Sequence, residues 1–90
     1  MNDIQGIRKV IRVLKHDGWT LDSVYNGDED IPVATEQAAI EEITSVDMAY
    51  LHVTRGDVRG WALFVLGNGP GEVLCDHTLN LTPLIDLELE

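Results

Sequence analysis

Ninety residues are enough for one small domain and too few for a second core, because a chain of this length buries only roughly 60–65% of the surface that its unfolded form exposes. The hydrophobic share of 44% supports a soluble globular fold, and no apolar run approaches the ~20 residues that cross a bilayer. The net charge of −10 argues against nucleic acid, phosphate-rich ligands and anionic membranes as direct partners.

The basic residues are gathered at the start of the chain. Four of the six lie before residue 16, and the other two stand among the fifteen carboxylates of residues 17–90, which are all of the sixteen except Asp3. An acidic body with a basic first helix is therefore expected. The basic residues are Arg8, Lys9, Arg12, Lys15, Arg55 and Arg59. The first residues lack the organisation of a secretory signal, and the single Cys75 cannot close an internal disulfide, so we expect a cytoplasmic protein.

Two stretches have the apolar spacing of an amphipathic helix. Residues 4–15 place isoleucine, valine and leucine along one stripe and most of the basic residues opposite it. Gly18 follows where a helix commonly ends on a residue with positive φ. Thr35 is a suitable N-cap for a second helix over residues 36–45, whose outer face is acidic.

Residues 19–25 between the helices alternate in the manner of a half-buried strand. This pattern places Trp19 and Tyr25 on the same face. Asn26-Gly27 then marks a turn, because glycine accepts a positive φ at little steric cost. Pro32 removes a backbone donor, so the short return segment is expected at a sheet edge.

The centre of the predicted fold is a β-hairpin over residues 48–66. Both arms are rich in β-branched and aromatic residues, and the polar residues 55–60 between them predict a loop of four to six residues. Packing under the two helices accounts for the apolar faces of this hairpin. A glycine-rich break follows, and residues 72–77 beyond it are either one helical turn or a short third strand, because so few residues show no period.

These elements predict an α+β fold in which two helices pack on a small antiparallel sheet, in the order α-β-β-α-β-β plus a short C-terminal element. Residues 1–90 are expected to form a single domain, with residues 1–3 and about 79–90 loosely ordered. The final Leu89-Glu90 matches a common expression-vector scar and is not assumed to be native.

Several short motifs lie between residues 4 and 78. They are Gly18-Trp19, Asn26-Gly27-Asp28, the helix over residues 35–43, and Trp61-x-x-Phe64-Val65-Leu66-Gly67-Asn68-Gly69-Pro70-Gly71-Glu72-Val73 followed by Asp76. On these residues the chain resembles a group of small acidic proteins encoded in tailed phages and bacterial prophages. The resemblance implies a phage or bacterial cytoplasmic setting in which small accessory proteins bind a host or phage protein, and it brings no catalytic residue.

The glycine-rich and acidic loops do not predict a cofactor or metal site. Residues 26–30 offer carboxylates, but a calcium loop would need glycine in place of Ile31 and glutamate in place of Gln37. Residues 67–71 match neither the dinucleotide fingerprint nor the nucleotide-triphosphatase loop. We therefore expect an acidic turn and a tight loop, with no cofactor and no metal.

One thiol and two imidazoles are the candidates for nucleophilic catalysis. Cys75 and His77 share a face only if their segment is extended, and the acidic surroundings do not favour a thiolate. We expect an inert, partly buried Cys75 and a His52 that is an ordinary residue of the sheet surface. A small enzyme built on these three residues is the least favoured alternative.

Acidic residues are concentrated on the first turn and the second helix, where they predict one continuous negative surface. Such a surface either solubilises the protein or complements a basic protein surface such as a DNA-binding groove. The leading hypothesis is a non-enzymatic interaction module, a DNA-mimic-like inhibitor or regulator that binds a basic surface of a host or phage protein. The alternatives are an immunity or antitoxin protein, a structural phage component, or a homodimer formed through an exposed strand edge. The seven candidate partner-binding residues, called the acidic set below, are Asp28, Glu29, Asp30, Glu36, Glu41, Glu42 and Asp47.

Overall fold

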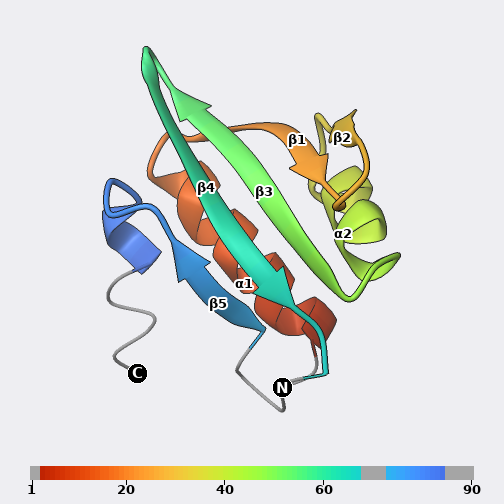
Figure 1. Ribbon diagram of the computed structural model, residues 1–90. Helices are drawn as coiled ribbons and strands as arrows, with labels where there is room; N and C mark the ends of the chain where they lie inside the picture. The colour runs from red at the N-terminus through yellow and green to blue at the C-terminus, as the bar shows by residue number, and fades with distance from the viewer. Residues whose placement is uncertain (1–2, 68–72, 85–90) are drawn as a thin grey trace.

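The structure is a computed structural model that describes residues 3–67 and 73–84. Its elements in chain order are α1 (Asp3–His16), β1 (Thr20–Tyr25), β2 (Asp30–Pro32), α2 (Glu36–Thr44), β3 (Met48–Arg55), β4 (Val58–Val65) and β5 (Leu74–His77). The strands form one antiparallel sheet in the order β2-β1-β3-β4-β5, and both helices lie against the same face of it (Figure 1). The predicted α+β fold is confirmed.

The central hairpin pairs β3 with β4 without interruption from Met48↔Val65 to Arg55↔Val58. Only Gly56 and Asp57 connect the strands, so the predicted loop of four to six residues is wrong. The φ of Gly56 is +62°, whereas the φ of Asp57 is not positive. This combination fits a two-residue turn with glycine at its first central position. Such a turn matches the strand twist, so the polar residues on either side remain paired.

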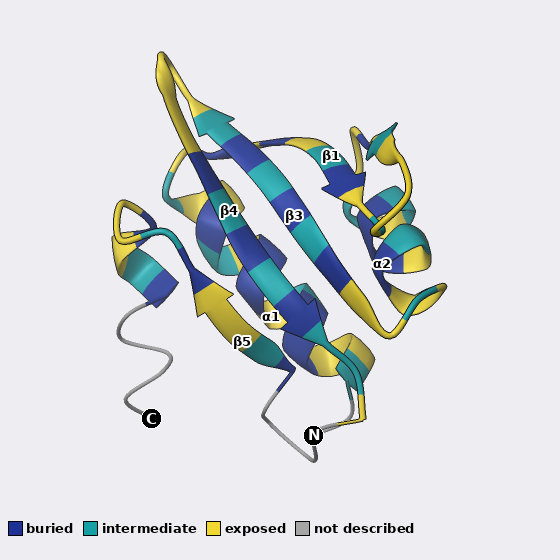
Figure 2. Ribbon diagram, viewed as in Figure 1, coloured by how far each residue is buried: buried dark blue, intermediate teal, exposed yellow. Residues whose placement is uncertain are grey.

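The two central strands alternate between buried and half-exposed residues, as Figure 2 shows along β3 and β4. Ala49, Leu51 and Val53 of β3 point toward the helices, together with Ala62 and Phe64 of β4. The core that they share with the helices and the flanking segments also contains Ile7, Val10, Ile11, Leu14, Trp19, Leu21, Val24, Val33, Ala39, Ile40, Ile43, Val73, Leu81 and Leu84.

The first strand differs from its predicted alternation. Its register against β3 shifts between Leu21 and Ser23, so Asp22 is an extra residue at a β-bulge. Because side chains alternate with a period of two, one extra residue reverses the phase of everything after it. Leu21 and Val24 therefore face the core, and Tyr25 lies on the opposite side from Trp19, contrary to the prediction that the two share a face.

Both helices end as their sequences indicate. Gly18 has a φ of +94° directly after α1, and the Trp19 amide donates to the Leu14 carbonyl oxygen at 3.0 Å. At the start of α2 the Thr35 hydroxyl oxygen accepts a hydrogen bond of 3.1 Å from the Ala38 amide, which makes Thr35 the N-cap. These contacts satisfy backbone groups that a helix end leaves without intrahelical partners.

The C-terminal part of the chain forms a fifth strand rather than a helical turn. β5 pairs with β4, and the chain then turns back so that Leu81 and Leu84 are fully buried. Residues 82–84 are helical. The first half of the stretch expected to be loosely ordered therefore contributes to the core, while residues 1–2 and 85–90, with the Leu89-Glu90 pair, lie outside the described residues.

Gly60 allows the turn after β5 to lie directly on the backbone of β4. A methyl group at Gly60 would lie 2.7 Å from Leu81 Cδ2 and 2.9 Å from Thr78 Oγ1. The same turn is held by hydrogen bonds, because Thr78 Oγ1 accepts from the Trp61 amide at 3.2 Å and Asn80 Nδ2 donates to the Arg59 carbonyl oxygen at 2.7 Å. The absence of a side chain at residue 60 is thus a steric requirement.

We predict that Gly60→Ala lowers the free energy of unfolding by about 1–3 kcal/mol, because the added methyl overpacks a site whose neighbour Leu81 is itself buried. Equilibrium denaturation in urea measures the change. In a Leu81→Ala background the cost of Gly60→Ala should shrink, since the closest contact is gone. A Gly60→Ala protein as stable as the parent would contradict the close approach.

Candidate functional site

Asp28 and Glu29 of the acidic set lie on the connection between β1 and β2, Asp30 is the first residue of β2, and all three are exposed. The Asn26 side-chain oxygen accepts hydrogen bonds from the backbone amides of Asp28 and Glu29 at 3.0 and 2.9 Å. Gly27 has a φ of +96°, as the turn signal predicts. Local hydrogen bonds therefore satisfy the backbone of this turn, and Asp28, Glu29 and Asp30 extend into solvent.

Glu36 differs from the rest of the acidic set because its carboxylate pairs with arginines of another helix. Its carboxylate accepts a hydrogen bond of 2.9 Å from Arg12 Nε and lies 3.8 Å from Arg8 Nε. These contacts join the start of α2 to the basic face of α1. Glu36 thus neutralises part of the basic helix instead of adding to an outward negative surface.

The remaining acidic residues lie on α2 and just after it. Glu41 accepts a hydrogen bond of 3.1 Å from Gln37 Nε2, one turn earlier on the same helix. Glu42 is half-buried, whereas Asp47 is exposed and its backbone oxygen accepts from the Leu66 amide at 2.9 Å. Helix α2 packs against β1 and β3 and lies at the same side of the sheet as the β1–β2 connection in Figure 1. The structure thus places the segments that carry the acidic set at one side of the sheet. Glu36 does not belong to the outward negative surface, because its carboxylate pairs with α1.

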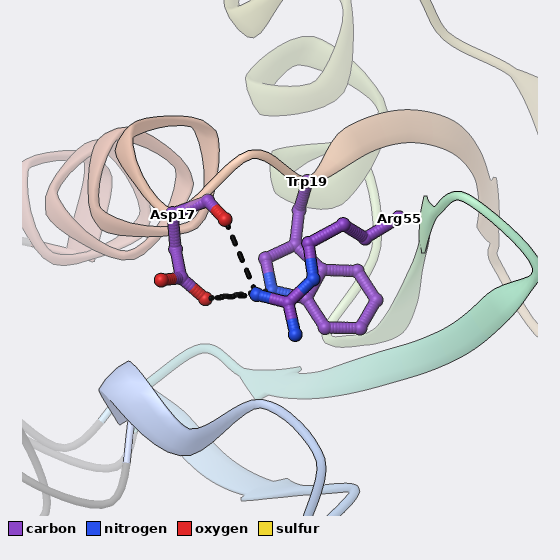
Figure 3. Close-up of polar contacts among 3 residues, drawn as sticks. All are labelled: Asp17, Trp19 and Arg55. Atoms are coloured by element: carbon purple, nitrogen blue, oxygen red, sulfur yellow. Dashed lines mark hydrogen bonds and ion pairs between the residues drawn. The ribbon is translucent and has the colours of Figure 1, made fainter.

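Arg55, at the tip of the central hairpin, is held by the end of α1. Arg55 Nη1 donates to the Asp17 carboxylate at 2.7 Å and to the Asp17 carbonyl oxygen at 3.2 Å, and the guanidinium carbon lies 4.8 Å from the centre of the Trp19 ring (Figure 3). Trp19 Nε1 donates to the same carboxylate at 3.2 Å. Arg55 therefore fastens the hairpin to the first helix.

The candidate nucleophile Cys75 shares β5 with His77, whereas His52 lies on β3. Cys75 is exposed at a register shift of β5, so the expectation of a partly buried thiol is wrong. The reason is the bulge, which turns this residue away from the core. His77 is only 7% exposed, and its Nδ1 lies 2.8 Å from the Thr78 carbonyl oxygen. His52 is half-buried on β3, and β4 runs between its strand and that of Cys75.

A shallow hollow of about 840 Å³ follows the outer side of α1. Its walls include Arg8 and Arg12, both of which contact Glu36, and an apolar part formed by Val13 and Pro83. Sequence reasoning did not identify this hollow because Pro83 reaches α1 only through the turn that follows β5. Arg8 and Arg12 share the single carboxylate of Glu36, and Lys9 also lines the hollow, so its charged lining is mainly basic.

Within residues 3–67 and 73–84, no helix covers the second face of the sheet, which is rich in aromatic residues. We call it the open face. The strand registers align one residue from each strand in a single row, namely Asp30, Tyr25, Tyr50, Leu63 and Asp76 from β2 to β5. Figures 1 and 2 look onto this face, with α1 and α2 behind the strands. The interpretation that packing under the two helices accounts for the apolar faces of the hairpin is therefore wrong for this outward face.

The aromatic side chains of the open face contact one another across three strands. The ring centres of Tyr25 and Tyr50 are 6.4 Å apart, and those of Tyr50 and Trp61 are 5.3 Å apart in an edge-to-face arrangement. His52 pairs with Trp61 in the neighbouring row, and Tyr25 is 39% exposed. The open face therefore presents a continuous aromatic strip.

Within residues 3–67 and 73–84, no group of three or more His, Cys, Asp or Glu side chains is placed to hold a metal ion. In the same described residues, no helix is long and apolar enough to cross a membrane. Comparison with protein-family models, curated proteins and solved structures finds no significant match to the chain. The surfaces described above are therefore the features of the molecule that bear on its function.

We predict that Arg55→Gln lowers the free energy of unfolding by about 0.5–1.5 kcal/mol, because it removes a half-exposed ion pair and a guanidinium stacked on Trp19. Thermal and urea unfolding measure the loss. Arg59→Gln is the matched control, since it removes the same charge from the same hairpin while the Arg59 hydrogen bond uses only the backbone oxygen. Equal stability of the two variants would refute a fastening role for Arg55.

Proposed function

We propose that this chain is a non-enzymatic interaction module of phage or bacterial origin that binds a basic surface of another protein. The observation that carries the proposal is the distribution of charge. Ten more carboxylates than cations are present, yet Arg8, Arg12 and Arg55 contact Glu36 and Asp17 within the molecule. The carboxylates of the β1–β2 connection project into solvent instead.

This arrangement suits recognition of a basic partner in two respects. Exposed carboxylates accelerate encounter with a basic surface and repel anionic competitors. The turn that carries them is braced by Asn26 and by the Tyr25 hydroxyl, which donates to the Gly27 carbonyl oxygen at 3.2 Å. A braced turn loses little conformational entropy on binding. An inhibitor or regulator that occupies the nucleic-acid groove of its partner is the form of this function that we favour.

The proposal predicts salt-sensitive capture of a basic protein. The immobilised chain should retain a protein from a bacterial lysate at low ionic strength and release it at roughly 0.5 M salt, where the Debye length is only a few ångströms. The captured protein is identified by mass spectrometry, purified and titrated by calorimetry. Failure to retain any basic protein at low salt would refute the proposed function.

Variants of the acidic turn make this test specific. Asp28→Asn and Glu29→Gln should each weaken binding of the captured protein by about 1.5- to 5-fold, as expected for a single exposed charge pair. Asp57→Asn at the hairpin tip removes the same charge from another exposed position and should change the affinity less than twofold. Equal effects of all three variants would mean that net charge, and not this turn, determines binding.

A further inference from the structure

The open face has a composition that a solvated sheet face normally avoids. An antiparallel sheet with one face in water usually carries polar residues on that face. Here five of the eight outward positions of β3 and β4 are apolar or aromatic, while His52, Thr54 and Arg59 occupy the others. The five are Met48, Tyr50, Trp61, Leu63 and Val65. Contiguous apolar surface of this kind commonly marks a binding site.

The two ends of the central row are charged. Asp30 on β2 and Asp76 on β5 are both exposed, and they close a row whose three inner members are Tyr25, Tyr50 and Leu63. Four strand spacings of about 4.8 Å separate the ends, which places the two carboxylates about 19 Å apart. The row thus has an aromatic and aliphatic centre between two negative ends.

A second copy of this chain is a poor occupant of the open face. In a symmetric dimer the open faces of two copies would stack with their rows aligned. Asp30 of one copy would then face either Asp30 or Asp76 of the other copy, so a carboxylate would oppose a carboxylate in both arrangements. Each copy also carries a net charge of −10. Nucleic acid is disfavoured for the same electrostatic reason, although bases stack well on aromatic rings.

We propose that the open face is the surface on which the basic partner docks, and that the partner contributes an extended segment with apolar side chains between two cationic ones. This proposal rests on the proposed function and names its contact site. The apolar side chains lie on Tyr25, Tyr50 and Leu63, and arginine or lysine reaches Asp30 and Asp76. An arginine additionally stacks on aromatic rings, as Arg55 does on Trp19 within this molecule.

The spacing of the row defines the segment. At about 3.3 Å per residue, six residues of extended chain cover about 20 Å, which matches the separation of the two carboxylates. Residues 1, 3, 5 and 7 of such a segment share one face, so two cations can flank two apolar side chains. The rest of the open face agrees with this chemistry. Among the outward residues of the described strands, Arg59 is the one cation, and it lies two rows away beside Thr54, whose hydroxyl donates to the Asp22 carboxylate at 3.2 Å.

The test uses a peptide of defined sequence, acetyl-Arg-Thr-Leu-Thr-Leu-Thr-Arg-amide, titrated at low salt into the isotopically labelled protein. NMR should show shifts of the Trp61 indole and of the β3 and β4 amides, while the indole of the buried Trp19 stays in place. The control peptide, acetyl-Arg-Thr-Arg-Thr-Leu-Thr-Leu-amide, has the same composition with its cations two residues apart. It should bind about 1.5- to 5-fold more weakly, because only one end of the row can be neutralised at a time.

Protein variants identify the groups that contact the peptide. The Asp30→Asn/Asp76→Asn protein should bind both peptides equally. The Asp57→Asn protein, which loses a charge at the hairpin tip away from the row, should retain the preference. Trp61→Thr should weaken binding, whereas Val58→Thr, which alters an exposed apolar residue at the hairpin tip, should not. Circular dichroism verifies folding, and the charge variants decide the matter if Trp61→Thr does not fold.

The possible results separate this inference from the proposed function. Shifts confined to the β1–β2 connection and α2 would overturn the open-face site and leave an acidic interaction module in place. No shift with either peptide would overturn the site, and lysate capture would then decide the function independently. Shifts of Trp61 on concentrating the protein alone would identify a second copy as the occupant, and shifts with oligothymidylate would identify nucleic acid; either result overturns the inference.

Discussion

The uninterrupted pairing of β3 with β4 is the constraint on which the rest of the structure depends. Its register assigns alternate residues to the two faces of the sheet, and a shift of one residue would exchange Leu51 and Phe64 for Tyr50 and Leu63 in the core. The inward set forms the floor on which α1 and α2 pack. The two-residue turn at Gly56 keeps this register to the end of the hairpin. The same pairing that builds the core therefore also creates the open face.

Two β-bulges adapt the flanking strands to this hairpin. The extra residue Asp22 turns Tyr25 outward beside Tyr50, and the extra residue Cys75 precedes Asp76 at the other edge. Without the first bulge Tyr25 would continue the inward phase of Leu21, and the row would lose one of its aromatic members. The alignment of Asp30, Tyr25, Tyr50, Leu63 and Asp76 is thus a product of register as much as of composition.

Sequence patterns were sufficient where the physical cause is local. The caps at Gly18 and Thr35, the edge position of Pro32 and the two amphipathic helices follow from neighbours a few residues apart, and the structure confirms them. Patterns failed where the cause is distant. A bulge has no signature in a six-residue strand, so Tyr25 was assigned to the wrong face, and β5 depends on pairing with β4 rather than on its own period. The sequence also places Glu36 in the outward acidic set, because its partner Arg12 is 24 residues away and no local pattern indicates their contact.

The two candidate surfaces, the acidic turn and the open face, also differ in how far the sequence alone predicts them. An exposed acidic turn is readable from Asn26-Gly27 and three following carboxylates, and it needs no tertiary information. The open face needs the registers of four strand pairs before its members come together. Charge alone would give a weak and unselective attraction, because exposed ion pairs contribute little each and are screened by salt. An aromatic strip between two carboxylates adds dehydrated contact area and a fixed spacing of charges, and selectivity for one basic segment over another follows from that combination.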